Sequence, residues 1–147
     1  MAEQVEPFPL YNFLVEIDGL PAAGFVQVSG LESSIEVIEY REGTDPALTH
    51  RKLPGKVTYA NVVLKAGVAK DRALYDWHKE WVTGGTGAKR KAVRIVLLDR
   101  SGTRVLAWRL HAAWPVKYTG PTLNATANEV AIETIELAHE GMDTDAD

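Results

Sequence analysis

The chain has 147 residues, of which 46% are apolar and 24% charged, and its formal net charge is −4. These values are typical of one soluble globular domain, which we expect to span residues 1–147. The absence of cysteine excludes a disulfide scaffold, a Cys-ligated zinc site and a thiol nucleophile. The longest basic cluster, Lys89–Lys91, is too short to form a phosphate-binding face, which argues against non-specific nucleic-acid binding.

The N-terminal segment Met1–Pro7 carries acids where a signal peptide needs basic residues, and no apolar run follows it. The longest uninterrupted apolar stretches, such as Ile95–Leu98, are far shorter than the roughly 20 residues that span a bilayer. The sequence therefore predicts synthesis and folding in the cytoplasm, without membrane anchoring.

The first third of the chain predicts three strands. Residues 11–17 alternate with an apolar side chain at every second position, and a short strand follows at 25–28. In the third run, 34–41, the apolar positions change parity between Val37 and Ile38. This change of phase indicates a β-bulge, or a strand that passes between two environments.

Residues 42–55 have Gly and Pro near both ends and are too long for a tight turn. A loop of this length in a compact domain is usually functional or disordered. Its middle, Leu48–Leu53, combines two leucines with three potentially basic residues. An extended arm that contacts a partner and a solvated loop are the two alternatives.

The next segments predict a strand at 56–65 with apolar side chains on both faces, and then a helix at 71–82. The apolar stripe of this helix is Leu74, Trp77, His78 and Trp81, spaced i, i+3, i+4 and i+7. Gly84 and Gly85 supply its C-terminal stop.

Three further strands are predicted at 93–98, 104–114 and 130–139, and the acidic tail 141–147 is expected to be disordered. About seven strands and one helix predict a mainly β fold, either a sandwich or a small barrel. The strands at 57–64 and 93–98 carry apolar side chains on both faces, and in a monomer one of these two faces would be exposed to solvent. Copies of the same chain could cover that second face, although a closed barrel or sandwich is a rival explanation.

No residue pattern points to catalysis or metal binding. The four histidines, at 50, 78, 111 and 139, are far apart and have no partner at metal-ligand spacing. Gly84–Arg90 has the glycines of a phosphate loop but neither its Gly-Lys-Ser/Thr order nor its strand-to-helix context. Glu133 and Glu136 are interpreted as solvated charges on a strand. We therefore expect no enzyme activity, no cofactor and no metal.

Segments along nearly the whole chain resemble the tail tube proteins of contractile phage tails and related contractile injection systems, the phage T4-like tail tube family. The segments that carry the resemblance are Tyr11–Gly19, Ala23–Phe25, Val28–Glu32, Arg51–Tyr59, Leu74–Trp77 and Ile135–Gly141.

The resemblance implies a structural protomer of a hollow inner tube. Six copies would form a ring in which the subunit sheets join into one ring-spanning β-barrel, and the rings would stack into a rigid tube. Sheath contraction would drive this tube through a target envelope. The implied partners are the sheath protein, baseplate and tube-terminator proteins, and a luminal cargo of effector proteins or phage DNA.

By the same resemblance, the chain would end up in a virion tail or an injection particle, which can be released from the cell. The helix would pack outside the barrel with Trp77 and Trp81 inward, and segment 42–55 would be the arm that reaches a neighbouring subunit or ring. The predicted contact residues are Thr44, Asp45, Leu48, His50, Arg51, Lys52 and Leu53. Two alternatives are a tube-initiating baseplate ring protein of the same family and a monomeric β-barrel that binds a small apolar ligand.

Overall fold

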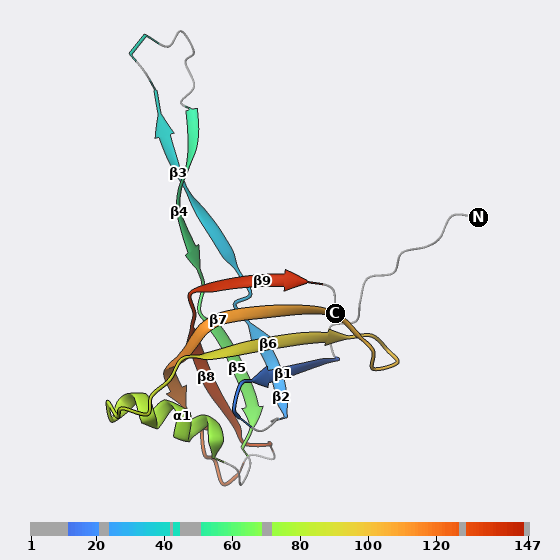
Figure 1. The fold of residues 1–147 in the computed structure, drawn as a ribbon. Helices are drawn as coiled ribbons and strands as arrows, with labels where there is room; N and C mark the ends of the chain where they lie inside the picture. Colours follow the sequence, from blue (N-terminus) through green and yellow to red (C-terminus); the bar gives the residue numbers. More distant parts are fainter. Residues whose placement is uncertain are drawn as a thin grey trace, which may run out of the picture.

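The computed structural model describes residues 12–20, 24–41, 43–44, 51–68, 72–126 and 129–145. Within these residues the fold is mainly β with one helix, as the sequence predicted (Figure 1). The elements are β1 (Phe13–Ile17), β2 (Phe25–Ser29), β3 (Ser33–Tyr40), β4 (Arg51–Tyr59), β5 (Val62–Gly67), α1 (Ala73–Val82), β6 (Lys91–Leu98), β7 (Arg104–Thr119), β8 (Ile132–Ala138) and β9 (Gly141–Asp145). No helix of the described residues is long and apolar enough to cross a membrane.

Seven strands form one antiparallel sheet, hydrogen-bonded in the order β1-β6-β7-β8-β5-β2, with β9 paired to β7. The long strand β7 belongs to both halves of this sheet, because residues 104–113 pair with β6 and residues 114–119 pair with β8. Ala112, with a φ of 52°, and a register shift after Pro115 mark the corner. The bend lets the two halves of the sheet face each other.

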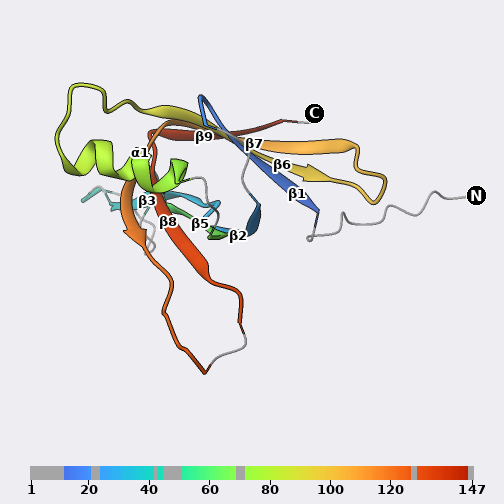
Figure 2. The ribbon, with the colours of Figure 1, turned by 90° about the horizontal axis from the view of Figure 1, so that it is seen from below.

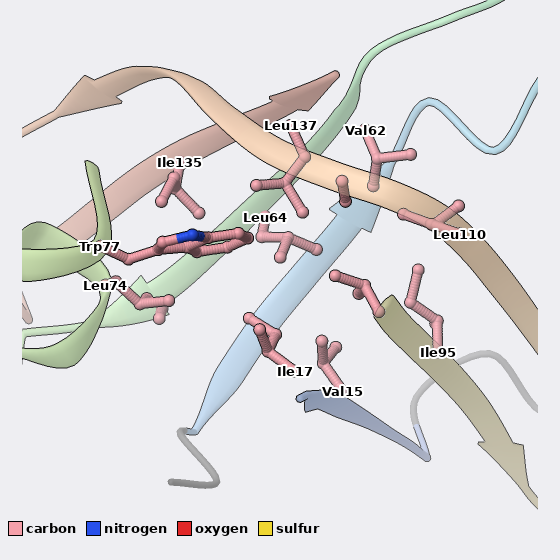
Figure 3. Close-up of a cluster of buried hydrophobic side chains, with 13 residues drawn as sticks. Val15, Ile17, Val62, Leu64, Leu74, Trp77, Ile95, Leu110, Ile135 and Leu137 are labelled. Atoms are coloured by element: carbon pink, nitrogen blue, oxygen red, sulfur yellow. The ribbon is translucent and has the colours of Figure 1, made fainter. Parts of the chain in front are cut away.

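The hydrophobic core lies between these two halves (Figure 3). Val15 and Ile95 contribute to it from one half, and Leu64 and Leu137 from the other, each at most 5% exposed. Apolar burial of this kind contributes about 1.5–3 kcal/mol for each large side chain.

Helix α1 closes one side of the core. Trp77 is 1% exposed, and its indole N–H donates to the carbonyl oxygen of Lys89 at 3.3 Å. Trp81 packs against the same core, with its ring centroid 5.0 Å from that of Trp114. The predicted helix and the inward orientation of Trp77 and Trp81 are confirmed.

Several predicted boundaries are wrong. Arg51–Gly55, expected in a loop, belong to β4, and the strand expected at 56–65 is divided at Ala60 and Asn61 into β4 and β5. The tail, expected to be disordered, forms β9 at Gly141–Asp145, so the described residues contain nine strands rather than about seven. β9 pairs with β7, and its side chains find long-range partners there, Arg109 for Asp145 and His111 for Asp143, which the local sequence does not reveal.

Candidate functional site: an assembly interface

Strands β3 and β4 form a two-stranded hairpin that projects from the body of the molecule (Figure 1). All eight residues of β3 are exposed, and the two strands pack chiefly on each other. A two-stranded hairpin is at best marginally stable by itself in water. An additional surface that covers its apolar side chains would therefore stabilise it.

The apolar side chains of the hairpin lie on opposite faces in its two halves, because successive residues of a strand point to opposite faces. The set nearer the body, called the root face, is Ile35, Val37 and Val57; the set farther out, called the tip face, is Ile38, Tyr40 and Leu53. These six side chains are 44–58% exposed. The hairpin thus offers one apolar surface near its root and a second, on the other side, near its tip.

A bulge accompanies the change of face. Ile35 pairs with Val57 but Val37 pairs with Pro54, so β4 has one more residue than β3 in this interval. The interval contains Gly55, where an added Cβ would lie 3.0 Å from the Ile38 side chain. Proline and glycine are both typical of bulged positions. A β-bulge was one of the two alternatives that the change of phase indicated, and the structure places the extra residue in β4 rather than in β3.

The root of the hairpin is held by two close contacts. His139 places Nε2 3.1 Å from the Ala60 carbonyl oxygen and Nδ1 3.1 Å from the Gly141 carbonyl oxygen, so it connects the β4–β5 junction to the start of β9. Gly30, with a φ of +89°, passes so near Asn61 that an added Cβ would lie 2.1 Å from its carbonyl oxygen. Only glycine fits where the chain leaves β2 for the hairpin.

The sheet also has open edges. In the part of the chain that the structure describes, β1 pairs with β6 alone and β2 with β5 alone. An apolar groove beside these edges is lined by Phe13, Val28, Leu31 and Trp108, among others. Edge strands present N–H and C=O groups that can pair with a strand from another chain.

The face of the sheet opposite the core carries charges across four strands. Glu16 lies opposite Arg94, Arg94 opposite Arg109, and Arg109 opposite Asp143. Arg109 also lies 3.1 Å from Asp145. Because exposed ion pairs contribute only about 0–1 kcal/mol each, this row makes the face polar without fixing it strongly to any one partner.

Glu133 is buried, contrary to the expected solvated position: it is 6% exposed. The Tyr118 hydroxyl donates to its Oε2 at 2.6 Å, and Arg72 Nη1 lies 3.7 Å from the same oxygen. The pKa of Tyr118 is raised, chiefly by burial and secondly by the hydrogen bond to Glu133. The hydrogen bond to Tyr118 is the main cause that raises the pKa of Arg72.

This trio fastens the start of α1 to β7 and β8. Its sequence signal was the alternation of β8, which puts position 133 on the same face as the buried Ile135 and Leu137. Within the described ranges, no group of three or more His, Cys, Asp and Glu residues could hold a metal ion.

The structure describes part of the predicted contact set: Thr44, Arg51, Lys52 and Leu53 lie within the described residues, and Asp45, Leu48 and His50 lie outside them. The three residues of β4 sit on the distal half of the hairpin, and Leu53 belongs to the tip face. Sequence reasoning missed Ile38 and Tyr40 as possible contacts, although the parity change had marked them. Their contact with a neighbour stays a prediction.

Comparisons with known proteins agree with this architecture. The family model described as T4-like virus tail tube protein gp19 matches residues 9–143. No curated protein matches the chain significantly.

Solved structures of injection systems are also similar. A chain in the PVC sheath–tube complex of an extracellular contractile injection system, in its extended state, is 30% identical, covers 95% of this chain and 92% of its own, and has a TM-score of 0.82. A chain in the tube-terminating cap of the anti-feeding prophage is 30% identical over 100% of this chain and 95% of its own, with a TM-score of 0.83. Hcp1 from Flavobacterium johnsoniae, at 12% identity and a TM-score of 0.59, covers 91% of this chain and 94% of its own and shares the fold.

Proposed function

The chain belongs to the T4-like virus tail tube protein family and is a tube protein of contractile injection systems, and from this premise we propose that its residues 1–147 form one tube domain, six copies of which close into a ring. Rings stack into the rigid inner tube of a phage tail or injection particle. The tube conducts effector proteins or DNA and is driven through a target envelope by the surrounding sheath. Its role is mechanical, with no catalytic step.

The observation that carries this proposal is the unfinished sheet. β1 and β2 each leave one side without a strand partner among the described residues, and the hairpin leaves both its faces uncovered. Pairing these edges with copies of the same chain would add main-chain hydrogen bonds, as in other cases of strand addition. Each square ångström of apolar surface covered adds about 25 cal/mol.

The partners follow from the context of the similar chains. The similar structures come from a sheath–tube complex, a tube-terminating cap and a baseplate. We propose the corresponding partners here: a sheath around the tube, a baseplate at one end and a terminator at the other. The chain is made in the cytoplasm and assembled there before the particle leaves the cell.

Electron microscopy of the purified protein, with sedimentation analysis, tests the proposal. We expect hollow rings with six-fold averages and rods built from them. A particle of single-chain mass at high protein concentration would overturn the proposal and favour a monomeric ligand-binding barrel. The apolar groove beside β1 and β2 would then be the ligand site to examine.

A second candidate is the ring that initiates the tube, because a chain of the anti-feeding prophage baseplate is 27% identical over 96% of this chain. Labelling the chain in intact particles separates the two roles. A label along the whole tube supports the main tube protein, and a label confined to one end supports the initiating ring.

The hairpin is proposed as the arm that reaches another subunit or ring, and of the predicted contact residues the structure places Arg51, Lys52 and Leu53 on its distal half. Deleting residues 44–51 should leave folded subunits that no longer stack. A deletion confined to residues 146–147 is the control and should stack normally. Undiminished stacking after the first deletion would remove the arm from the proposal.

A further inference from the structure

The charges of the hairpin are sorted by strand. β3 carries two acids and no basic residue, whereas β4 carries three basic residues and no acid. They are Glu36 and Glu39 on β3, and Arg51, Lys52 and Lys56 on β4, and all five are exposed. The body edge strands β1 and β2 hold one charged residue between them. Among these four strands, the sorting of charge is therefore particular to the hairpin.

Each strand of the hairpin also has an open edge. Within the described residues, β3 pairs only with β4 and β4 only with β3. The hairpin therefore presents an acidic edge on one side and a basic edge on the other. The N–H and C=O groups along such edges can pair with a strand from another chain.

The acids and bases match in level and in face. Glu39 lies directly opposite Lys52 in the register, so the two residues share one level and one face of the hairpin. Glu36 and Lys56 each lie one residue farther out than the root-face pair and point to the opposite face. Each face thus has an acid on β3 and a base at a similar level on β4.

We propose that the hairpins of neighbouring copies stand side by side in the ring, the acidic edge of one against the basic edge of the next, and that these charges select which edges meet. This inference rests on the proposed ring and names the residues that set the order of its subunits. The occupant of each edge is a second copy of this chain.

Rotation about a ring axis preserves the level of each residue and the face to which it points. With the hairpins upright on the ring, Lys52 of the next copy comes to the level of Glu39, and Lys56 to that of Glu36. Figure 1 shows the hairpin rising from one end of the body, and Figure 2, drawn from below, shows it behind the body. The outer part of the hairpin is therefore accessible to neighbours on both sides.

The same charges oppose the pairings that would prevent a ring. Two β3 edges would bring glutamates against glutamates, and two β4 edges would bring lysines against lysines, and like charges in direct opposition are destabilising. Those contacts are isologous and close into a pair, whereas an acidic edge against a basic edge is heterologous and continues around a ring. The charges therefore favour ring closure chiefly by excluding the alternatives.

Two charge-reversed variants test the inference. One, called the basic hairpin, has Glu36→Lys and Glu39→Lys; the other, called the acidic hairpin, has Lys52→Glu and Lys56→Glu. Alone, each should form at least about tenfold fewer rings than the unmodified chain in electron micrographs and sedimentation, because like charges meet at every junction.

Mixing the two variants shows whether the effect lies between chains. Every junction of an alternating ring joins an acidic edge to a basic edge, so rings should return. With one variant labelled with heavy nitrogen, native mass spectrometry should find equal numbers of the two chains in each ring. Repulsion within a hairpin is unchanged by mixing, so recovery can come only from contacts between chains.

The matched control places the same change of charge on α1. Asp76→Lys with Glu80→Lys alters two exposed acids of the helix, as the basic hairpin alters two acids of β3. This control should form rings alone. Loss of its rings to the same extent would show an effect of total charge and would overturn the assignment to the hairpin.

A variant with all four hairpin substitutions is a second test, because each of its hairpins keeps opposite charges on its two strands. It should form rings alone and should stay out of rings of the unmodified chain. Normal rings from either reversed variant, no rings from the mixture or from the fourfold variant, or free mixing of the fourfold variant with the unmodified chain would overturn this inference and leave the proposed ring intact. Absence of rings from the unmodified protein would overturn the proposed function itself.

Discussion

Replacing Gly30 by alanine should destabilise the root of the hairpin through two separable effects. The φ of +89° at this position costs a residue with a Cβ roughly 1–2 kcal/mol. The added Cβ would lie 2.1 Å from the Asn61 carbonyl oxygen and 3.2 Å from the Val62 Cα, so backbone must shift. Overpacking of this kind costs about 1–3 kcal/mol. The two effects together predict a loss of about 2–5 kcal/mol in the free energy of unfolding.

Two other glycines provide controls that isolate each effect. Gly102 has a φ of +86° and open space around its Cβ position, so Gly102→Ala should lose only the roughly 1–2 kcal/mol of backbone strain. Gly67 has open space and no positive φ, so Gly67→Ala should change stability by less than about 1 kcal/mol. Urea unfolding at a protein concentration too low for assembly gives the three values, because assembly would add its own concentration-dependent stability.

The relative losses in free energy of unfolding of the three variants test whether the close approach of Gly30 to Asn61 constrains the hairpin root. If Gly30→Ala and Gly102→Ala cost the same, the close approach to Asn61 does not constrain the root and the reasoning is refuted. If Gly30→Ala has the larger cost, its rods should also be shorter or absent, because a shifted root redirects the whole hairpin.

Three further predictions concern other contacts. Tyr118→Phe should lower the free energy of unfolding by about 1.5–3 kcal/mol in urea titrations, since the buried Glu133 carboxylate loses a hydroxyl donor. His139→Ala should cost about 1–3 kcal/mol and speed amide hydrogen exchange at Ala60, because two carbonyl groups lose their ring contact. The Ser101 hydroxyl and the Thr103 N–H hold the pKa of Asp99 below its ordinary 3.8, so its stabilisation is present above that pH and lost as the pH falls through the lowered value. Acid unfolding of Asp99→Ala should lack this component.

Local periodicity was sufficient to predict elements whose partners are already implied by their pattern. The alternation around Val15 and the stripe through Trp77 each identify one buried face, so β1 and α1 were predicted with the correct orientation. The parity change after Val37 marked the bulge and, with it, the two-faced hairpin. These patterns involve residues close together in the sequence, and in the fold the apolar face that each pattern defines is the buried face.

The missed features depend on partners far away in the sequence. β9 has little apolar pattern and is ordered by register with β7, where Asp143 lies opposite Arg109. Pro54 and Gly55 indicate a loop by composition, yet pairing with β3 places both in a strand. A glutamate on a strand is usually expected to be exposed. Glu133 is buried instead, because the Tyr118 hydroxyl donates to its carboxylate and Arg72 lies nearby.

The uneven distribution of burial connects the subunit to the rod. The core between the two sheet halves is buried within one chain, whereas the hairpin retains six half-exposed apolar side chains that the proposed neighbours would cover. Serines and glutamates make up half of β3, so a single docked hairpin would bury a modest apolar area and be held weakly. In the proposed ring every copy would contribute the same contact at once, and linked contacts gain avidity beyond any one of them. A weak contact repeated around each ring would therefore allow reversible addition of layers and still give a stiff tube.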